Sequence, residues 1–84
     1  MTTSDAVEAM VKVMGPYIGD TMARSATEAH CQKLGIAAGP LPTDRLDALL
    51  AKLGSGLNIF LGRDKSALVM AEVRRALATL EASR

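Results

Sequence analysis

The stretch from Gly15 to Gly35 constrains the fold of this chain most, because its pattern is that of one amphipathic helix between two glycine breaks. At 100° per residue, small and apolar side chains gather on one side, and charged and polar side chains gather on the other. The small and apolar side consists of Ile18, Gly19, Met22, Ala23, Ala26, Ala29, His30 and Leu34. This pattern predicts a helix on which a neighbouring helix packs closely.

Composition favours helix throughout the chain. Hydrophobic residues make up 49% of the sequence and aromatic residues only 2%, so the core must come from Ala, Leu, Val, Ile and Met. Many Ala and Leu, with few β-branched or aromatic residues, favour helix over strand. A chain of 84 residues is expected to form one domain, 1–84, with a thin core that self-association would support.

Glycine and proline predict where the helices begin and end. Gly15-Pro16 separates the first helix from the second, either as a turn or as a kink in one bent helix. Gly35 is expected to end the second helix as a left-handed cap, before a linker over 36–42. Residues 54–56 (Gly-Ser-Gly) interrupt the third helix, and Gly62 precedes the last. The expected fold is an all-α bundle, orthogonal or up-and-down, with helices at about 5–14, 16–34, 43–53 and 64–82.

Residues 57–62 fit a helix, a strand or a loop, and we favour a fifth short helix at 55–61. Ser4 or Asp5 is expected to cap the first helix, and Asp64 the last. The inward sides of the helical wheels predict the core. Its expected members are Val7, Met10, Ile18, Met22, Ala26, Leu46, Leu49, Leu50, Leu53, Phe60, Val69, Val73, Leu77 and Leu80. Leu68 falls on the polar side of the last helix, where it would meet solvent or a partner.

No pattern of residues predicts an active site. His30-Cys31 comes closest, but a nucleophilic cysteine needs a base within hydrogen-bond reach, and neighbours on a helix point about 100° apart. We expect His30 at the edge of the core and Cys31 at or near the surface. A thiol redox sensor at Cys31 remains as an alternative, which would need a thiolate at neutral pH.

Metal and cofactor sites are not predicted either. Glu28, His30 and Cys31 do not share a helix face, as ligands of one metal ion would. The chain has no phosphate-binding loop and no nucleophile elbow. We therefore expect no enzyme activity, no metal and no cofactor.

Charge argues against nucleic acid as a partner. Ten basic and nine acidic residues leave a net charge of +1, whereas nucleic-acid binding relies on clustered positive charge. The alternative is a small DNA-binding regulator that uses the basic residues of the last helix. These are Arg63, Lys65, Arg74 and Arg75. Asp64 and Glu72 lie among them, which favours a solvated helix face.

Location follows from cysteine content and hydropathy. One cysteine forms no internal disulfide, the start lacks a secretory leader, and the uncharged runs are too short to span a bilayer. We expect a cytoplasmic protein.

The small-residue side of the second helix predicts close packing against another helix, of this chain or of a second one. It either packs on the last helix within one chain or forms part of a symmetric dimer. Five methionines add an adaptable apolar surface of the kind that binds partner helices. We expect a non-enzymatic protein-interaction domain that binds another protein or itself. The expected contact residues are Gly19, Met22, Ala23 and Leu68.

Residues 17–24, Tyr-Ile-Gly-Asp-Thr-Met-Ala-Arg, resemble the Tyr-Ile-Gly-Pro-x-Ala stretch of a small helical module. That module is found at the ends of some bacterial serine/threonine kinases and other signalling proteins. Residues 57–62 look like its later apolar segment before a glycine that opens the last helix. Asp20 stands where the module usually has proline, and this chain carries no kinase. The resemblance implies a non-catalytic accessory role in bacterial signalling, and it transfers no active-site residue.

Overall fold

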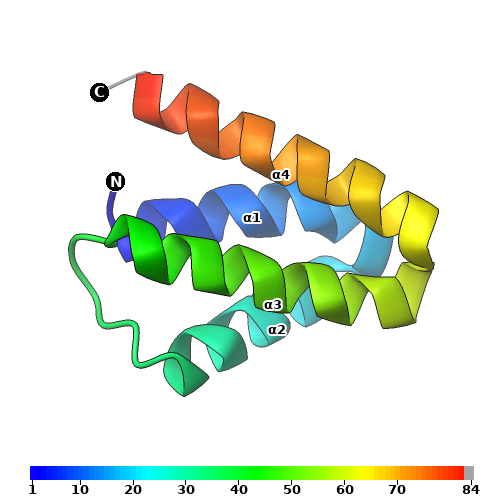
Figure 1. Ribbon diagram of the computed structural model, residues 1–84, viewed down its shortest axis with the longest axis horizontal. Helices are drawn as coiled ribbons and strands as arrows, with labels where there is room; N and C mark the ends of the chain where they lie inside the picture. The colour runs from blue at the N-terminus through cyan, green and yellow to red at the C-terminus, as the bar shows by residue number, and fades with distance from the viewer. Residues whose placement is uncertain (83–84) are drawn as a thin grey trace.

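The computed structural model describes residues 1–82 and shows four α-helices (Figure 1). The helices are α1 (Thr3–Ile18), α2 (Asp20–Lys33), α3 (Thr43–Leu61) and α4 (Arg63–Ala82). Within residues 1–82 no strand forms, and an isolated bridge pairs Thr2 with Pro40. Residues 83 and 84, the end of the expected 1–84 domain, lie outside the described residues. The expected all-α bundle is confirmed.

Consecutive helices run in alternating directions, so the bundle is up-and-down, with α2 inclined to the others (Figure 1). α1 packs against α2 and α4, and α3 packs against the same two helices, which closes a four-membered ring. The core fills this ring with aliphatic side chains. Its largest fully buried hydrophobic members are Met10, Met14, Leu49, Val69 and Val73.

The break between the first two helices falls at Gly19, so the expected boundaries of 5–14 and 16–34 are wrong. Pro16 lies inside α1, in its last turn, and α1 closes where the Gly19 N–H donates to the Gly15 carbonyl at 2.7 Å. Gly19 has φ +91°, a conformation that glycine adopts far more readily than other residues. Gly15 lies within α1, where an added Cβ would meet the carboxylate of Asp20, an exposed side chain that can turn aside.

α3 continues through residues 54–56, so the expected end at Leu53 and the separate short helix over 55–61 are wrong. Each glycine weakens a helix by about 0.5–1 kcal/mol relative to alanine. Packing outweighs this cost, because Leu57 is buried in the core and the Ser66 hydroxyl of α4 donates to the Gly54 carbonyl at 3.2 Å. Gly62, with φ +85°, ends α3, and α4 begins one residue later at Arg63.

The end of α2 matches the sequence prediction. Gly35 has φ +68° and its N–H donates to the Gln32 carbonyl at 3.1 Å. The Ile36 N–H donates to the Cys31 carbonyl at 2.9 Å. This pair of bonds is a Schellman motif, which satisfies carbonyls that the helix leaves open.

The start of α1 differs from the sequence prediction. Thr2 caps the helix in place of Ser4 or Asp5, and its hydroxyl accepts from the Asp5 N–H at 3.1 Å. The linker then folds back onto this end of the chain. The Thr3 N–H donates to the Gly39 carbonyl at 2.8 Å, and the Leu41 N–H donates to the Met1 carbonyl at 3.1 Å. The chain start and the α2–α3 linker therefore hold one another in place.

Two expected core residues lie at the surface. Met22 is 47% exposed and Phe60 is 56% exposed. They belong to α2 and α3, the pair of neighbouring helices with the least extensive contact. The remaining expected core residues are buried or half-buried. The space beside Met22 and Phe60 is the candidate site.

Candidate functional site

An apolar groove of about 300 Å³ lies between α2 and α3. α2 contributes residues spaced by one turn, and α3 contributes its second half. The lining residues are Met22, Ala26 and His30 of α2, Leu53, Gly56, Leu57, Ile59 and Phe60 of α3, and Met14 and Ile18 of α1. We call this space the α2–α3 groove. Of the described residues that line it, His30 alone is titratable.

The groove exists because small residues stand where two helices could otherwise fill the space. Ala26 on α2 and Gly56 on α3 contribute little or no side chain to it. A Cβ atom added at Gly56 would meet nothing within 4 Å. Larger side chains at these two positions would therefore narrow the groove.

Exposed apolar side chains border the groove. Ile59 is 90% exposed, and Met22 and Phe60 are each about half exposed. Burying a large aliphatic or aromatic side chain is worth about 1.5–3 kcal/mol, so leaving three of them in water forgoes substantial stabilisation. Clusters of this kind mark contact surfaces for other molecules.

Positive charge borders the opposite end of the groove. His30 is half-buried, and this burial lowers the pKa of its imidazole. The charges of Lys33, one turn further along α2, and Lys52, on α3, lower that pKa further. Because α2 and α3 run in opposite directions, His30 and Lys52 lie at one end, and Met22 and Phe60 lie at the other. We call His30, Lys33 and Lys52 the basic end.

The predicted contact residues separate in the structure. Met22 lines the α2–α3 groove, and Gly19 is exposed in the turn between α1 and α2. Ala23 is fully buried within its own chain, so it offers no surface to a partner and that assignment is wrong. Leu68 is 57% exposed on α4, as its place on the helical wheel predicted, but it does not line the groove.

The four basic residues of α4 are all exposed but do not form one patch. Arg63 and Arg74 border the same shallow depression between α3 and α4. At 100° per residue these two share one side of the helix, whereas Lys65 and Arg75 point to other sides. The geometry thus brings together two of the four positive charges that a DNA-binding face would need.

Cys31 is buried, contrary to the expected surface position. Burial raises the pKa of its thiol, and the nearby charge of Glu28 raises it further. Both effects disfavour the thiolate that a nucleophile or redox sensor requires. His30 contributes to the α2–α3 groove instead.

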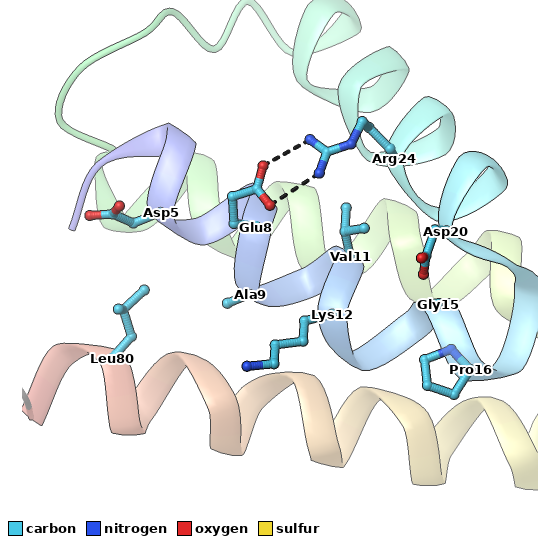
Figure 2. Close-up of a pocket in the computed structure, with 10 residues that line it drawn as sticks. All are labelled: Asp5, Glu8, Ala9, Val11, Lys12, Gly15, Pro16, Asp20, Arg24 and Leu80. Atoms are coloured by element: carbon cyan, nitrogen blue, oxygen red, sulfur yellow. Dashed lines mark hydrogen bonds and ion pairs between the residues drawn. The ribbon is translucent and has the colours of Figure 1, made fainter.

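A larger hollow, of about 890 Å³, lies along α1 and is lined by charged residues of both signs (Figure 2). Figure 2 shows the Arg24 guanidinium of α2 reaching across to the Glu8 carboxylate of α1. Two nitrogen–oxygen distances of 2.9 and 3.0 Å join the pair. The hydrogen bond and the charge of Arg24 lower the pKa of Glu8. This hollow is thus the site of an ion pair that ties α1 to α2.

Neither Ile59 nor Phe60 is predicted at the surface when residues 57–62 are considered separately from the third helix. A wheel drawn over the whole of α3 places Ile59 roughly 130° from the centre of the leucine stripe, at 100° per residue. That wheel would have identified Ile59 as exposed. It would not have identified Phe60, which falls on the stripe side and is exposed because α2 does not cover it.

Comparison with known proteins leaves the function to be argued from the site itself. No family model, curated protein or solved structure matches this chain. Among residues 1–82, no three His, Cys, Asp or Glu side chains are grouped so that they could hold a metal ion. Over the same residues, every helix is too short or too polar to cross a membrane.

Proposed function

We propose that this protein is a non-enzymatic interaction domain whose α2–α3 groove binds a helical segment of a partner protein. The observation that supports this is the groove itself, an apolar channel bordered by three exposed apolar side chains. An amphipathic helix that lays its apolar side into such a groove is a recurrent mode of recognition. The flexible thioether of Met22 suits a surface that adapts to its partner.

The dimensions of the groove suit a short helix. From Met22 to His30 the wall of α2 extends about 12 Å, at 1.5 Å per residue. That length matches about two turns, over which a helix presents side chains at i, i+3 or i+4, and i+7. Two or three apolar side chains of a partner would fill the space that Ala26 and Gly56 leave open.

The cellular setting is part of the same proposal. The resemblance of residues 17–24 to the accessory module of bacterial kinases supports a regulatory role in bacterial signalling, in the cytoplasm. A second copy of this chain is one partner that the groove could take, which would make the protein a homodimer.

The proposal is tested with Phe60→Glu, which places a charge at the border of the groove, and with Leu68→Glu as the matched control. Both side chains are more than half exposed, so neither substitution opens the core. Peptides selected from a displayed library of amphipathic helices should bind the wild-type protein and Leu68→Glu. Phe60→Glu should weaken them at least about tenfold, since one buried Phe is worth more than 1.4 kcal/mol.

Light scattering distinguishes the dimer from other partners. A mass of two chains that falls to one chain in Phe60→Glu identifies the partner as a second copy. Peptides that bind Phe60→Glu as tightly as wild type, or the absence of any selected peptide together with a monomeric mass, contradict the proposed function.

A further inference from the structure

The basic end of the α2–α3 groove carries positive charge that the bundle itself does not balance. Among residues 1–82, neither Lys33 nor Lys52 takes part in a side-chain hydrogen bond or ion pair. The nearest acidic residue along α2, Glu28, lies 3.8 Å from a guanidinium nitrogen of Arg24. The two lysines therefore present positive charge next to an apolar surface, beside the neutral imidazole of His30.

The groove is thus asymmetric along its length. Its outer end exposes Met22, Ile59 and Phe60, and its other end is bordered by His30 and the two lysines. A partner that buries apolar side chains at the Met22 and Phe60 end places other side chains over the basic end. Charge of the opposite sign is favoured there, and charge of the same sign is repelled.

We infer that the groove takes an acidic amphipathic helix, with apolar side chains placed over Ala26 and Gly56 and carboxylates one to two turns further along, against Lys33 and Lys52. The spacing follows from the two walls, because Lys52 lies four positions from Gly56 on α3 and Lys33 lies seven positions from Ala26 on α2. Lys33 and Lys52 lie on different helices, and both are close enough to His30 for their charges to act on it, so acidic side chains placed beside His30 meet positive charge from both walls. This inference rests on the proposed function and adds the chemistry of the partner.

The test uses two synthetic helical peptides that share the apolar residues found by selection. One carries Glu at the two positions nearest the basic end, and the other carries Gln there, so that shape is retained and charge is removed. Fluorescence anisotropy is expected to show tighter binding of the Glu peptide by about threefold to fivefold per lysine contacted at low salt. The preference should largely disappear at 1 M salt, where charges are screened within about 3 Å.

Charge reversal on the protein supplies the second arm. Lys33→Glu combined with Lys52→Glu should make the Gln peptide the better ligand. Lys12→Glu, a reversal on the far side of the bundle, should leave the preference for the Glu peptide unchanged. Both lysines of the basic end are exposed, so these variants should fold as the wild type does.

Each outcome separates the inference from the proposal beneath it. If the two peptides bind equally and Phe60→Glu abolishes both, the groove binds a helix but the acidic partner is wrong. If Phe60→Glu changes neither affinity, the proposed function fails as well. The inference of an acidic partner is also overturned if the selected peptides are rich in Lys or Arg, or if the protein self-associates through the groove.

Discussion

Among the residues that line the groove, His30 is the titratable one. Burial and the two lysines hold its pKa below the ordinary value of 6.5, so the folded state favours the neutral imidazole. The unfolded chain then binds the proton more tightly, and protonation favours unfolding. We expect the free energy of unfolding to fall as the pH drops below 6.5 and to stay level above it, as measured by urea denaturation. In His30→Gln the free energy of unfolding should change less with pH below 6.5. If it falls as steeply as in the wild type, other groups cause the pH dependence.

Tyr17 ties α1 to α4 through one hydrogen bond. Its hydroxyl donates to the Glu72 carboxylate at 2.6 Å, and this bond is the main cause that raises the pKa of Tyr17 above its ordinary value of 10.0. A folded-state pKa above the unfolded value contributes stability that is present below pH 10 and lost as the pH rises through the folded value. Tyr17→Phe should therefore lower the thermal midpoint at pH 7. Above pH 10 the thermal midpoint of the variant should fall less than that of the wild type, because the variant has no phenol to ionise at this position. Equal falls in the two proteins would contradict this assignment.

At the scale of the helix, α3 contains two glycines that differ in their surroundings. Gly56 lines the groove with open space beside it, whereas a Cβ at Gly54 would lie 3.7 Å from Met70 Cγ, an ordinary contact. Alanine at either position should raise the free energy of unfolding by about 0.5–1 kcal/mol, because alanine loses less backbone entropy in a helix.

Binding separates the two variants. The methyl group of Gly56→Ala projects into the groove, so this variant should bind the selected peptides more weakly than wild type. Gly54→Ala is the matched control and should bind them normally. Equal affinities in the two variants would place the partner elsewhere on the bundle.

At Gly19, in contrast, replacement of glycine by alanine should destabilise the protein. Its φ of +91° lies where other residues are strained, and nothing lies within 4 Å of an added Cβ. Gly19→Ala should therefore lower the free energy of unfolding by about 1–3 kcal/mol through the backbone alone. Urea denaturation measures this change, and a neutral result would show that the α1–α2 turn relaxes without cost.

The sequence predicted those helix ends that depend on local bonds. Gly35 was identified as a cap because the Schellman motif needs only a left-handed residue and the last turn of the same helix. Gly15 and Gly54 do not break their helices. Gly15 lies beside the Asp20 carboxylate, and the Gly54 carbonyl accepts a hydrogen bond from the Ser66 hydroxyl. The Ser66 bond comes from the next helix, twelve residues away, so the pattern around Gly54 carries no sign of it.

The same limit applies to the candidate site. A helical wheel predicts which side of a helix is apolar, but not whether a neighbouring helix covers it. Met22 and Phe60 both belong to apolar sides, and both are exposed because α2 and α3 contact each other least in the ring. Met10 and Val73, which have neighbours on all sides, were predicted correctly as core.

For the molecule as a whole, stability rests on a small aliphatic core. The ring of helices is closed by α1 and α4, and its fully buried large hydrophobic side chains are methionine, leucine and valine. Domains of this size bury a modest share of their surface, which keeps the free energy of unfolding low. A partner helix in the groove would add apolar contact that the core lacks.

The buried thiol of Cys31 makes the opening of this bundle measurable by chemical labelling. Cys31 is the one cysteine of the chain and is 7% exposed beside a surface hollow of about 340 Å³, so a thiol reagent reaches its sulfur fully only when the side chains or helices around it move. At about 0.05 kcal/mol per residue, global opening would slow labelling about a thousandfold relative to the unfolded chain at the same pH. Mass spectrometry measures the labelled fraction of the protein over time and so gives this rate. Labelling at nearly the unfolded rate would mean that local motion around this hollow exposes the sulfur without unfolding of the whole bundle.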